Sequence, residues 1–365
     1  MEMSQLGGWI SVAVGLFLLL VLSWWAHLRY WLRLLSIELD YDSVERLPTE
    51  DGSAIELRHI AARSGVSKAS ALPPVLMVHG LGANHRNSDL HPDASLARHL
   101  ATTGRDVWLL TLRSGLGGLR RRDRRRVFFA AILRHDLPMA IEAVCERARA
   151  SQVDYIGYSM GGMLLYAGID RTVPASRIRR AVFIASPAFV APPLGILHVF
   201  RRWPNHRIPG LPLRLIARTW AFMVARKAAP KVFGNRRNVS PVLARTAMVS
   251  VIEDVPGPLQ ADFARWAFAD GFIRVDGENV LERLDEVRVP ALFLAGPVDT
   301  LAPPSSVRYA YEAWGRNHPD VRKEWRLYGR SEGYAGNYGH GDFLVGAHVD
   351  TEVFPPITEF LAEAS

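Results

Sequence analysis

The strongest indication of the fold is the segment Val153-Asp154-Tyr155-Ile156-Gly157-Tyr158-Ser159-Met160-Gly161-Gly162. A short apolar run leads to Ser159, which has glycines two residues before and after it, and an apolar, helix-forming run follows at 163–167. This G-x-S-x-G pattern predicts a tight, strained turn from a buried strand into a helix, with the serine at its apex. Glycine is needed on both sides because a Cβ there would collide with neighbouring backbone. The start of the helix would then offer free N–H groups to a negative charge beside the serine.

The serine needs partners before it can act as a nucleophile, and without them the motif is a glycine-rich turn that happens to contain a serine. The base candidate is His340, on a glycine-rich loop after the last expected strand, and His348 is the alternative. The acid candidate is Asp299, just past the apolar run 291–296. Asp342 is the alternative acid, but one residue separates it from His340, which makes a contact with the imidazole Nδ1 awkward.

Candidates for an oxyanion site flank the serine in the expected fold. The segment His79-Gly80-Leu81-Gly82 follows a buried apolar run at 75–78, and its glycines allow backbone to approach the serine closely. We expect the backbone N–H of Leu81 to be one donor and that of Met160 to be the other. His79 is interpreted as a loop histidine that shapes this segment and does not transfer protons.

The rest of the chain alternates apolar strands with helical stretches, which is typical of a doubly wound, mostly parallel α/β sheet. Residues 36–47 and 53–62 read as an antiparallel hairpin that precedes this alternation. The expected parallel strands are 75–78, 106–111, 153–157, 180–185, 291–294 and 324–328. The expected helices between and after them are 93–103, 137–150, 160–171, 304–313 and 348–364.

The segment from Pro187 to Glu286 is too long to be a loop of a compact domain. It contains proline-rich stretches and helical patterns at about 213–227 and 261–268, so we expect a helical cap that covers the serine. The predicted organisation is a membrane anchor (1–35), a first part of the core (36–186), the cap (187–286) and a second part of the core (287–365).

With these motifs in this order, the chain resembles the α/β-hydrolase superfamily and, within it, the acid lipase-like branch. The motifs are 79–82, Asp106-Val107-Trp108-Leu109, His135-Asp136-Leu137-Pro138, the serine turn and His340-Gly341-Asp342-Phe343. The resemblance implies cleavage of a carboxylic ester of a lipid through an acyl-serine. The segment Leu112-Arg113-Ser114-Gly115 departs from the Asn-Ser-Arg-Gly-like turn usual in that branch. The superfamily also includes thioesterases, acyltransferases and catalytically inactive relatives, so acyl transfer and a non-catalytic binding protein stay as alternatives.

The N-terminal segment is long and apolar enough to be a membrane anchor. Residues 6–26 contain no charged side chain, and about 20 residues suffice for a helix to cross a bilayer. A cleaved signal peptide is the alternative, but the segment lacks a basic start and a clear A-x-A site. Arg29 and Arg33 follow the span. By the positive-inside rule, we expect a single-pass protein with its catalytic domain in the cytoplasm.

The chain is basic, with a formal net charge of +8 and a pI of about 9.9, and the excess is local. From Arg171 to Ile252 there are 15 lysine and arginine residues and no aspartate or glutamate. Apolar residues interleave with them, which is the composition expected of a cap that contacts an anionic membrane surface. A second arginine cluster lies at 120–126. Lipid headgroups are its expected partners, and nucleic acid is not.

The remaining sequence features predict an enzyme that uses no cofactor. The single cysteine, Cys145, excludes an internal disulfide framework. The sequence has no histidine and cysteine spacing typical of a metal site, no P-loop and no dinucleotide-binding fingerprint. We therefore expect no cofactor and no metal.

Overall fold

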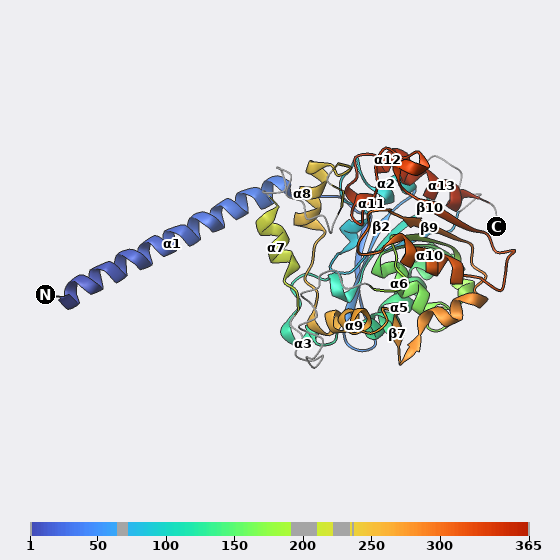
Figure 1. Cartoon of the computed structure of the whole chain (residues 1–365), viewed down its shortest axis with the longest axis horizontal. Helices are drawn as coiled ribbons and strands as arrows, with labels where there is room; N and C mark the ends of the chain where they lie inside the picture. The colour runs from blue at the N-terminus through green and yellow to red at the C-terminus, as the bar shows by residue number, and fades with distance from the viewer. Residues whose placement is uncertain (1, 64–71, 191–209, 222–233, 236, 364–365) are drawn as a thin grey trace.

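The computed structural model describes residues 2–63, 72–190, 210–221, 234–235 and 237–363. A sheet forms its centre (Figure 1). The sheet has eight strands in the order β1-β2-β4-β3-β5-β6-β9-β10. The strands are β1 (Ser43–Pro48), β2 (Ala54–Ile60), β3 (Val75–Val78), β4 (Val107–Thr111), β5 (Val153–Tyr158), β6 (Ile178–Ile184), β9 (Ala291–Ala295) and β10 (Lys323–Leu327). Only β1 and β2 pair antiparallel to their neighbours, so the predicted mostly parallel sheet is confirmed.

Burial explains why these segments are strands. Every residue of β3, β4, β5 and β9 is buried, as expected for parallel strands that are covered by helices on both faces. The edge strand β1 instead alternates half-buried and exposed residues, so only one of its faces packs on the protein. The predicted hairpin is therefore present, with shorter strands than the sequence patterns suggested.

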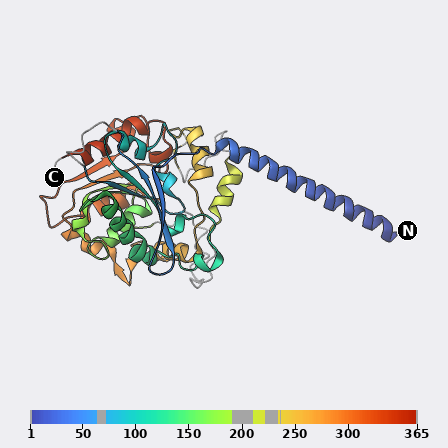
Figure 2. The same ribbon diagram turned by 180° about the vertical axis from the view of Figure 1, so that it is seen from behind.

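Helices cover both faces of the sheet (Figures 1 and 2). One face carries α5 (Leu137–Ala148), α6 (Met160–Gly168) and α10 (Pro304–Ala313), which contact β5 and β9. The other face carries α2 (Leu96–Thr102) and α13 (Phe354–Ala362), which contact each other. This is the doubly wound arrangement that the alternation of strands and helices predicts.

The expected helix 348–364 is wrong, because the chain forms two short helices there. They are α12 (Val349–Glu352) and α13, and α11 (Asp342–Val345) precedes them. Pro355 and Pro356 lie in the first turn of α13. Proline lacks an N–H and clashes with the preceding turn, so it is tolerated at a helix start and breaks a helix interior. The expected helix 93–103 is also shorter, since Ser95 caps α2 and accepts a hydrogen bond from the Arg98 N–H.

A long insertion separates β6 from β9. Its described elements are α7 (Leu213–Trp220), α8 (Pro241–Ser250), α9 (Gly257–Phe268), the strands β7 (Arg274–Val275) and β8 (Glu278–Asn279), and a 3-10 helix at Val280–Glu286. The sequence patterns predicted helices near α7 and α9 but missed α8. The far end of the expected helix 213–227, and seven of the basic residues of the insertion, lie outside the described residues. The seven are Arg201, Arg202, Arg207, Arg226, Lys227, Lys231 and Arg236.

The N-terminal helix α1 (Glu2–Leu35) projects from the domain, and its C-terminal end lies against α7 and α8 (Figures 1 and 2). Within the described residues, α1 is the one helix long and apolar enough to cross a bilayer, with a mean hydropathy of 2.1 in the most apolar 18 residues of Gly8–Leu35. A signal sequence near the N-terminus passes the same test. Length and hydropathy therefore allow a membrane span and carry no information on its orientation.

A buried ion-pair cluster holds the turn after β4, where the sequence departs from the acid-lipase pattern. The Arg113 guanidinium donates through Nε to Asp136 Oδ1 at 2.8 Å and through Nη2 to Asp51 Oδ1 at 3.0 Å. The Arg113 and Asp136 side chains have no solvent exposure. The cluster therefore ties the hairpin turn and the start of α5 to the sheet, close to the strand ends that carry the site.

Candidate active site

The serine turn forms because glycines allow two close approaches. Ser159 lies between β5 and α6 with φ +52 and ψ −116, a strained conformation for a residue with a side chain. A Cβ on Gly157 would lie 2.5 Å from the Gly162 nitrogen, and one on Gly161 would collide with the Val78 carbonyl oxygen. The Ser159 N–H donates to the Ile184 carbonyl of β6 at 2.9 Å, which fixes the turn at the end of the sheet.

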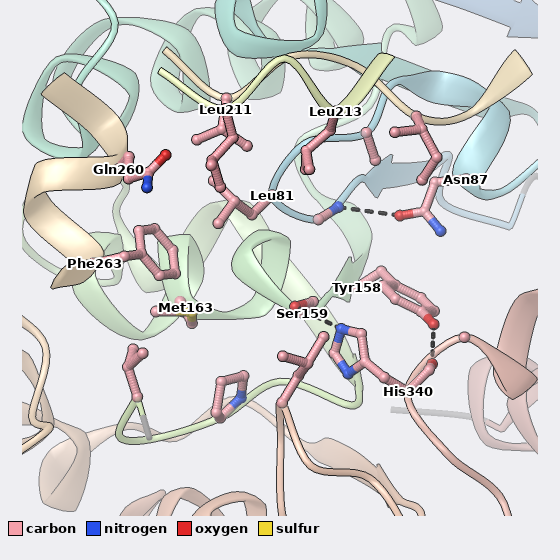
Figure 3. Close-up of a pocket in the computed structure, with 18 of the residues that line it drawn as sticks. Leu81, Asn87, Tyr158, Ser159, Met163, Leu211, Leu213, Gln260, Phe263 and His340 are labelled. Carbon is pink, nitrogen blue, oxygen red and sulfur yellow. Dashed lines mark hydrogen bonds between the residues drawn. The ribbon is translucent and has the colours of Figure 1, made fainter. Parts of the chain in front are cut away.

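The structure brings Ser159, His340 and Asp299 into one chain of hydrogen bonds. His340 Nε2 is 3.1 Å from Ser159 Oγ (Figure 3). On the other side of the ring, His340 Nδ1 is 2.8 Å from Asp299 Oδ2. Because a carboxylate only accepts hydrogen bonds, the proton of the neutral imidazole lies on Nδ1. His340 Nε2 is then free to accept the Ser159 hydroxyl proton, which is the arrangement that makes serine nucleophilic.

Asp299 is oriented by backbone before it meets the histidine. Its Oδ1 accepts from the N–H groups of Leu301 and Ala302, each at 2.8 Å, while Oδ2 faces His340. Burial alone would raise the pKa of Asp299, but the charge of His340 and these hydrogen bonds outweigh burial and lower the pKa. Asp299 is therefore ionised at neutral pH and can stabilise a positive charge on His340.

Asp342, the alternative acid, holds the histidine loop and is not the partner of the imidazole. Its carboxylate accepts from the backbone N–H of Gly339 at 2.8 Å and of Asn235 at 3.0 Å, and it does not contact the imidazole Nδ1. Burial raises its pKa to about 6. Asp342 thus links the histidine loop to the insertion. The alternative base His348 is exposed at the start of α12, away from Ser159.

Further contacts fix the histidine loop on the sheet side. The Tyr158 hydroxyl donates to the His340 carbonyl oxygen (Figure 3). The two rings meet edge to face with centroids 5.6 Å apart. The sequence gives no signal for this contact, because Tyr158 is the variable position of the motif and reads as an ordinary buried aromatic.

The loop after β3 is shaped by His79 and Asn87. His79 is buried, and its Nδ1 donates to the Gly80 carbonyl at 2.8 Å while Nε2 accepts from the Leu112 N–H at 3.1 Å. Burial lowers the pKa of His79 to about 4, so the ring is neutral and structural, as expected. Asn87 Oδ1 accepts from the Gly80 N–H at 3.0 Å, a contact that no sequence pattern indicated. The Leu81 side chain lies at the cavity beside Ser159.

Ser159 and His340 lie in the wall of a cavity of about 300 Å³ (Figure 3). Most of the lining is apolar and comes from the loop after β3, from α6, and from the insertion on either side of α8. The labelled apolar side chains are Leu81, Met163, Leu211, Leu213 and Phe263, and the labelled polar ones are Asn87, Tyr158, Ser159, Gln260 and His340. A small apolar cavity with a few convergent polar groups is the usual form of a ligand site.

A family model described as the alpha/beta hydrolase fold matches residues 73–329. The chain therefore belongs to this family. It is 28% identical to mouse lipase member K, over 38% of this chain and 37% of that protein. It is 27% identical to human lysosomal acid lipase/cholesteryl ester hydrolase, over 45% of this chain and 43% of that protein. The predicted likeness to acid lipases is thereby confirmed.

The chain spans about two fifths of the length of the curated relatives it matches. Solved structures agree on the fold. An esterase from Exiguobacterium antarcticum superposes with a TM-score of 0.56 at 15% identity, covering 87% of this chain and 99% of that one.

Proposed function

We propose that the protein is a serine hydrolase that cleaves a carboxylic ester of a lipid-like molecule through an acyl-serine. The observation that carries the proposal is the hydrogen-bonded chain from Asp299 through His340 to Ser159, at the wall of an apolar cavity. The base His340 lies within hydrogen-bond reach of both the nucleophile and the orienting acid, which is the geometry that this chemistry needs. The similarity to proteins named as lipases supports an ester as substrate.

In the first step Ser159 Oγ bonds to the ester carbonyl carbon, and His340 Nε2 takes the hydroxyl proton. Asp299 holds the imidazole and stabilises its positive charge. The tetrahedral intermediate collapses as the bond to the alcohol oxygen breaks, and His340 gives its proton to that oxygen. A water molecule, deprotonated by His340, then attacks the acyl-serine, and the acid leaves as the proton returns to Ser159.

The oxyanion of the tetrahedral intermediate needs donors that are fixed before the reaction. We assign this part to the backbone N–H groups of Leu81 and Met160. Met160 is the first residue of α6, where amide groups have no acceptor within the helix, and α6 directs its positive end at the same point. Leu81 follows Gly80, whose backbone Asn87 fixes.

The membrane is the proposed second partner. We propose that α1 is a single-pass anchor with the hydrolase domain in the cytoplasm, since Arg29 and Arg33 follow its apolar part. Residues 187–286 are the proposed cap. On the side where α1 meets the domain, α7 exposes Leu215, Ile216 and Trp220. Such a face suits insertion into the interface of an anionic bilayer, with basic residues around it.

Part of the cap's positive charge is neutralised within the protein. Arg214 of α7 pairs with Glu253, and Arg124 of the arginine cluster pairs with Asp254. In the described residues the exposed apolar side chains therefore carry more of the membrane proposal than these two arginines do. The basic residues outside the described part would add to it.

Turnover of a chain-length series of p-nitrophenyl esters tests the proposed function. We expect hydrolysis that increases from short toward longer acyl chains, and Ser159→Ala should lower kcat by roughly 10⁴-fold or more. Ser114→Ala, the same change at a buried serine outside the cavity, is the matched control and should keep activity. Product analysis with added alcohol or thiol acceptor would detect acyl transfer. Turnover that is unchanged in Ser159→Ala would refute the proposal.

A further inference from the structure

The cavity contains a polar side chain that the proposed hydrolysis does not use. Gln260 lies on α9 and points into the cavity, across from Ser159 and His340 (Figure 3). Its Oε1 is buried and, among the described residues, has no hydrogen-bond partner. A buried acceptor without a donor destabilises the folded state, so native proteins rarely keep one without a reason.

The neighbours of Gln260 show that its position is one where an apolar residue would normally lie. The face of α9 that lines the cavity also carries Phe263, Ala264 and Ala267, at the three- and four-residue spacing of a helix. Leucine or methionine at 260 would continue this apolar face without loss of helix propensity. The amide is therefore the one polar group that α9 contributes to the lining among the described residues.

We propose that Gln260 is a specificity-determining residue that binds a hydroxyl group of the substrate, so that the site takes an ester that also carries a free hydroxyl. A hydroxyl can donate to Oε1 and can equally accept from the amide Nε2, so it matches either orientation of the side chain. The inference rests on the proposed function of Ser159. The hydroxyl belongs to the alcohol part, as in a glycerol monoester, or to the acyl chain, as in a hydroxy acid.

Two substrate pairs distinguish these sources. The first compares glycerol 1-monodecanoate with propyl decanoate, and the second compares p-nitrophenyl hydroxydecanoates with p-nitrophenyl decanoate. We expect the hydroxylated member of one pair to have a kcat/KM roughly tenfold higher, because only that member satisfies the buried amide. Gln260→Leu should remove the preference by slowing the hydroxylated member, while Gln260→Glu, which keeps an acceptor oxygen, should retain it.

The matched control is Gln152→Leu, the same change at a glutamine outside the cavity whose amide donates to the Ser176 carbonyl. It should leave both pairs as in the wild type. No preference in either pair, or a preference that persists in Gln260→Leu, would overturn the inference while the ester turnover itself upholds the proposed function.

A binding measurement separates the inference from catalysis. Thermal stabilisation by glycerol 1-decyl ether is compared with that by decyl propyl ether. In the second pair, propyl ethers with a hydroxyl on the decyl chain are compared with decyl propyl ether. If no ester is turned over, the proposed function fails. Stronger stabilisation by a hydroxylated ether in the wild type, but not in Gln260→Leu, would then still support Gln260 as a hydroxyl-binding residue. Equal stabilisation by both members of each pair would overturn it.

Discussion

The two walls of the cavity are built on different principles. On the sheet side, Ser159 and Asp299 follow β5 and β9, whose residues are all buried, and His340 follows β10, whose residues are half-buried. Hydrogen bonds that involve backbone groups fix each of the three. On the insertion side, α7 turns Leu213 toward the cavity and exposes Leu215, which is 61% accessible. The first wall is complete within the chain. Among the described residues, the second presents apolar side chains outward, a feature that is common at surfaces that bind a partner or a membrane.

This difference implies a division of labour. Changes on the sheet side should alter stability or the chemical step, since Ser159, His340 and Asp299 each have a hydrogen-bond partner inside the protein. Changes on the outer face of the insertion should leave both intact and alter how a membrane-embedded substrate reaches the cavity. Four substitutions test this division, in order of decreasing effect.

The largest effect is expected for Asp299→Asn. The amide would donate to His340 Nδ1 and favour the tautomer that cannot accept the Ser159 proton, so kcat should fall by roughly 10⁴-fold with folding intact. Asp276→Asn, which removes an exposed partner of Arg134, is the control and should keep activity. Steady-state turnover of a soluble p-nitrophenyl ester is the measurement. A loss of less than tenfold in Asp299→Asn would contradict its role.

Removal of the buried cation at the turn after β4 should be the largest change in stability. Arg113→Met leaves the Asp136 carboxylate buried without its partner, and we expect a loss of about 3–5 kcal/mol in the free energy of unfolding. The double variant Arg113→Met, Asp136→Leu should recover much of that loss, since no buried charge remains. Urea unfolding measures both. A neutral effect of Arg113→Met would show that the cluster does not hold the sheet-side wall.

The neutral histidine under the Leu81 loop predicts a pH-dependent stability. His79 titrates near pH 4 in the folded protein and near 6.5 in the unfolded chain, so only the unfolded state takes up a proton between these values. The stability due to His79 is therefore present above pH 6.5 and lost as pH falls toward 4, by on the order of 3 kcal/mol. Unfolding free energies at pH 7 and pH 5 should differ less in His79→Asn than in the wild type. Equal differences would argue against this burial.

The smallest effect is expected on the insertion side. Leu215→Asp should leave unfolding and the turnover of a soluble short-chain ester unchanged, because the side chain is exposed. With the full chain reconstituted in anionic vesicles, turnover of a membrane-embedded long-chain ester should fall roughly tenfold. Leu215→Met keeps the apolar surface and serves as the control. An equal loss on both substrates would place Leu215 in the chemistry and not at the interface.

The same difference governs how far the sequence could predict the structure. The apolar runs 75–78, 153–156 and 291–295 are short, and each is followed by a glycine within two residues. Few other sequence patterns produce a covered parallel strand. The serine turn demands glycine at two fixed positions because of close backbone contacts, so Gly157 and Gly161 mark it directly. The proximity of His340 and Asp299 to Ser159 then follows from the common edge at which the parallel strands end.

Other features have no local signature. Helix α8 is weakly amphipathic and lies against α7 and the end of α1, so its burial depends on contacts far away in the sequence. The contacts of Asn87, Tyr158 and Asp342 join loops that only the finished fold brings together. Gln260 lies just before the expected helix 261–268 and has no signal of a binding role until the cavity is known. The break in the expected helix 348–364, by contrast, has a local signal. Pro355 and Pro356 can start a helix but cannot lie in the interior of one.

The most direct test of Ser159 as the nucleophile is labelling with a fluorophosphonate probe, followed by identification of the modified residue by peptide mass spectrometry. The probe phosphonylates a serine that an adjacent base activates, so it reports the nucleophile without any assumption about substrate. The full chain in detergent should be labelled on Ser159, and labelling should disappear in Ser159→Ala. Absence of label in the wild type, or label on another serine that persists in Ser159→Ala, would contradict the assignment of Ser159, His340 and Asp299 as the reacting groups.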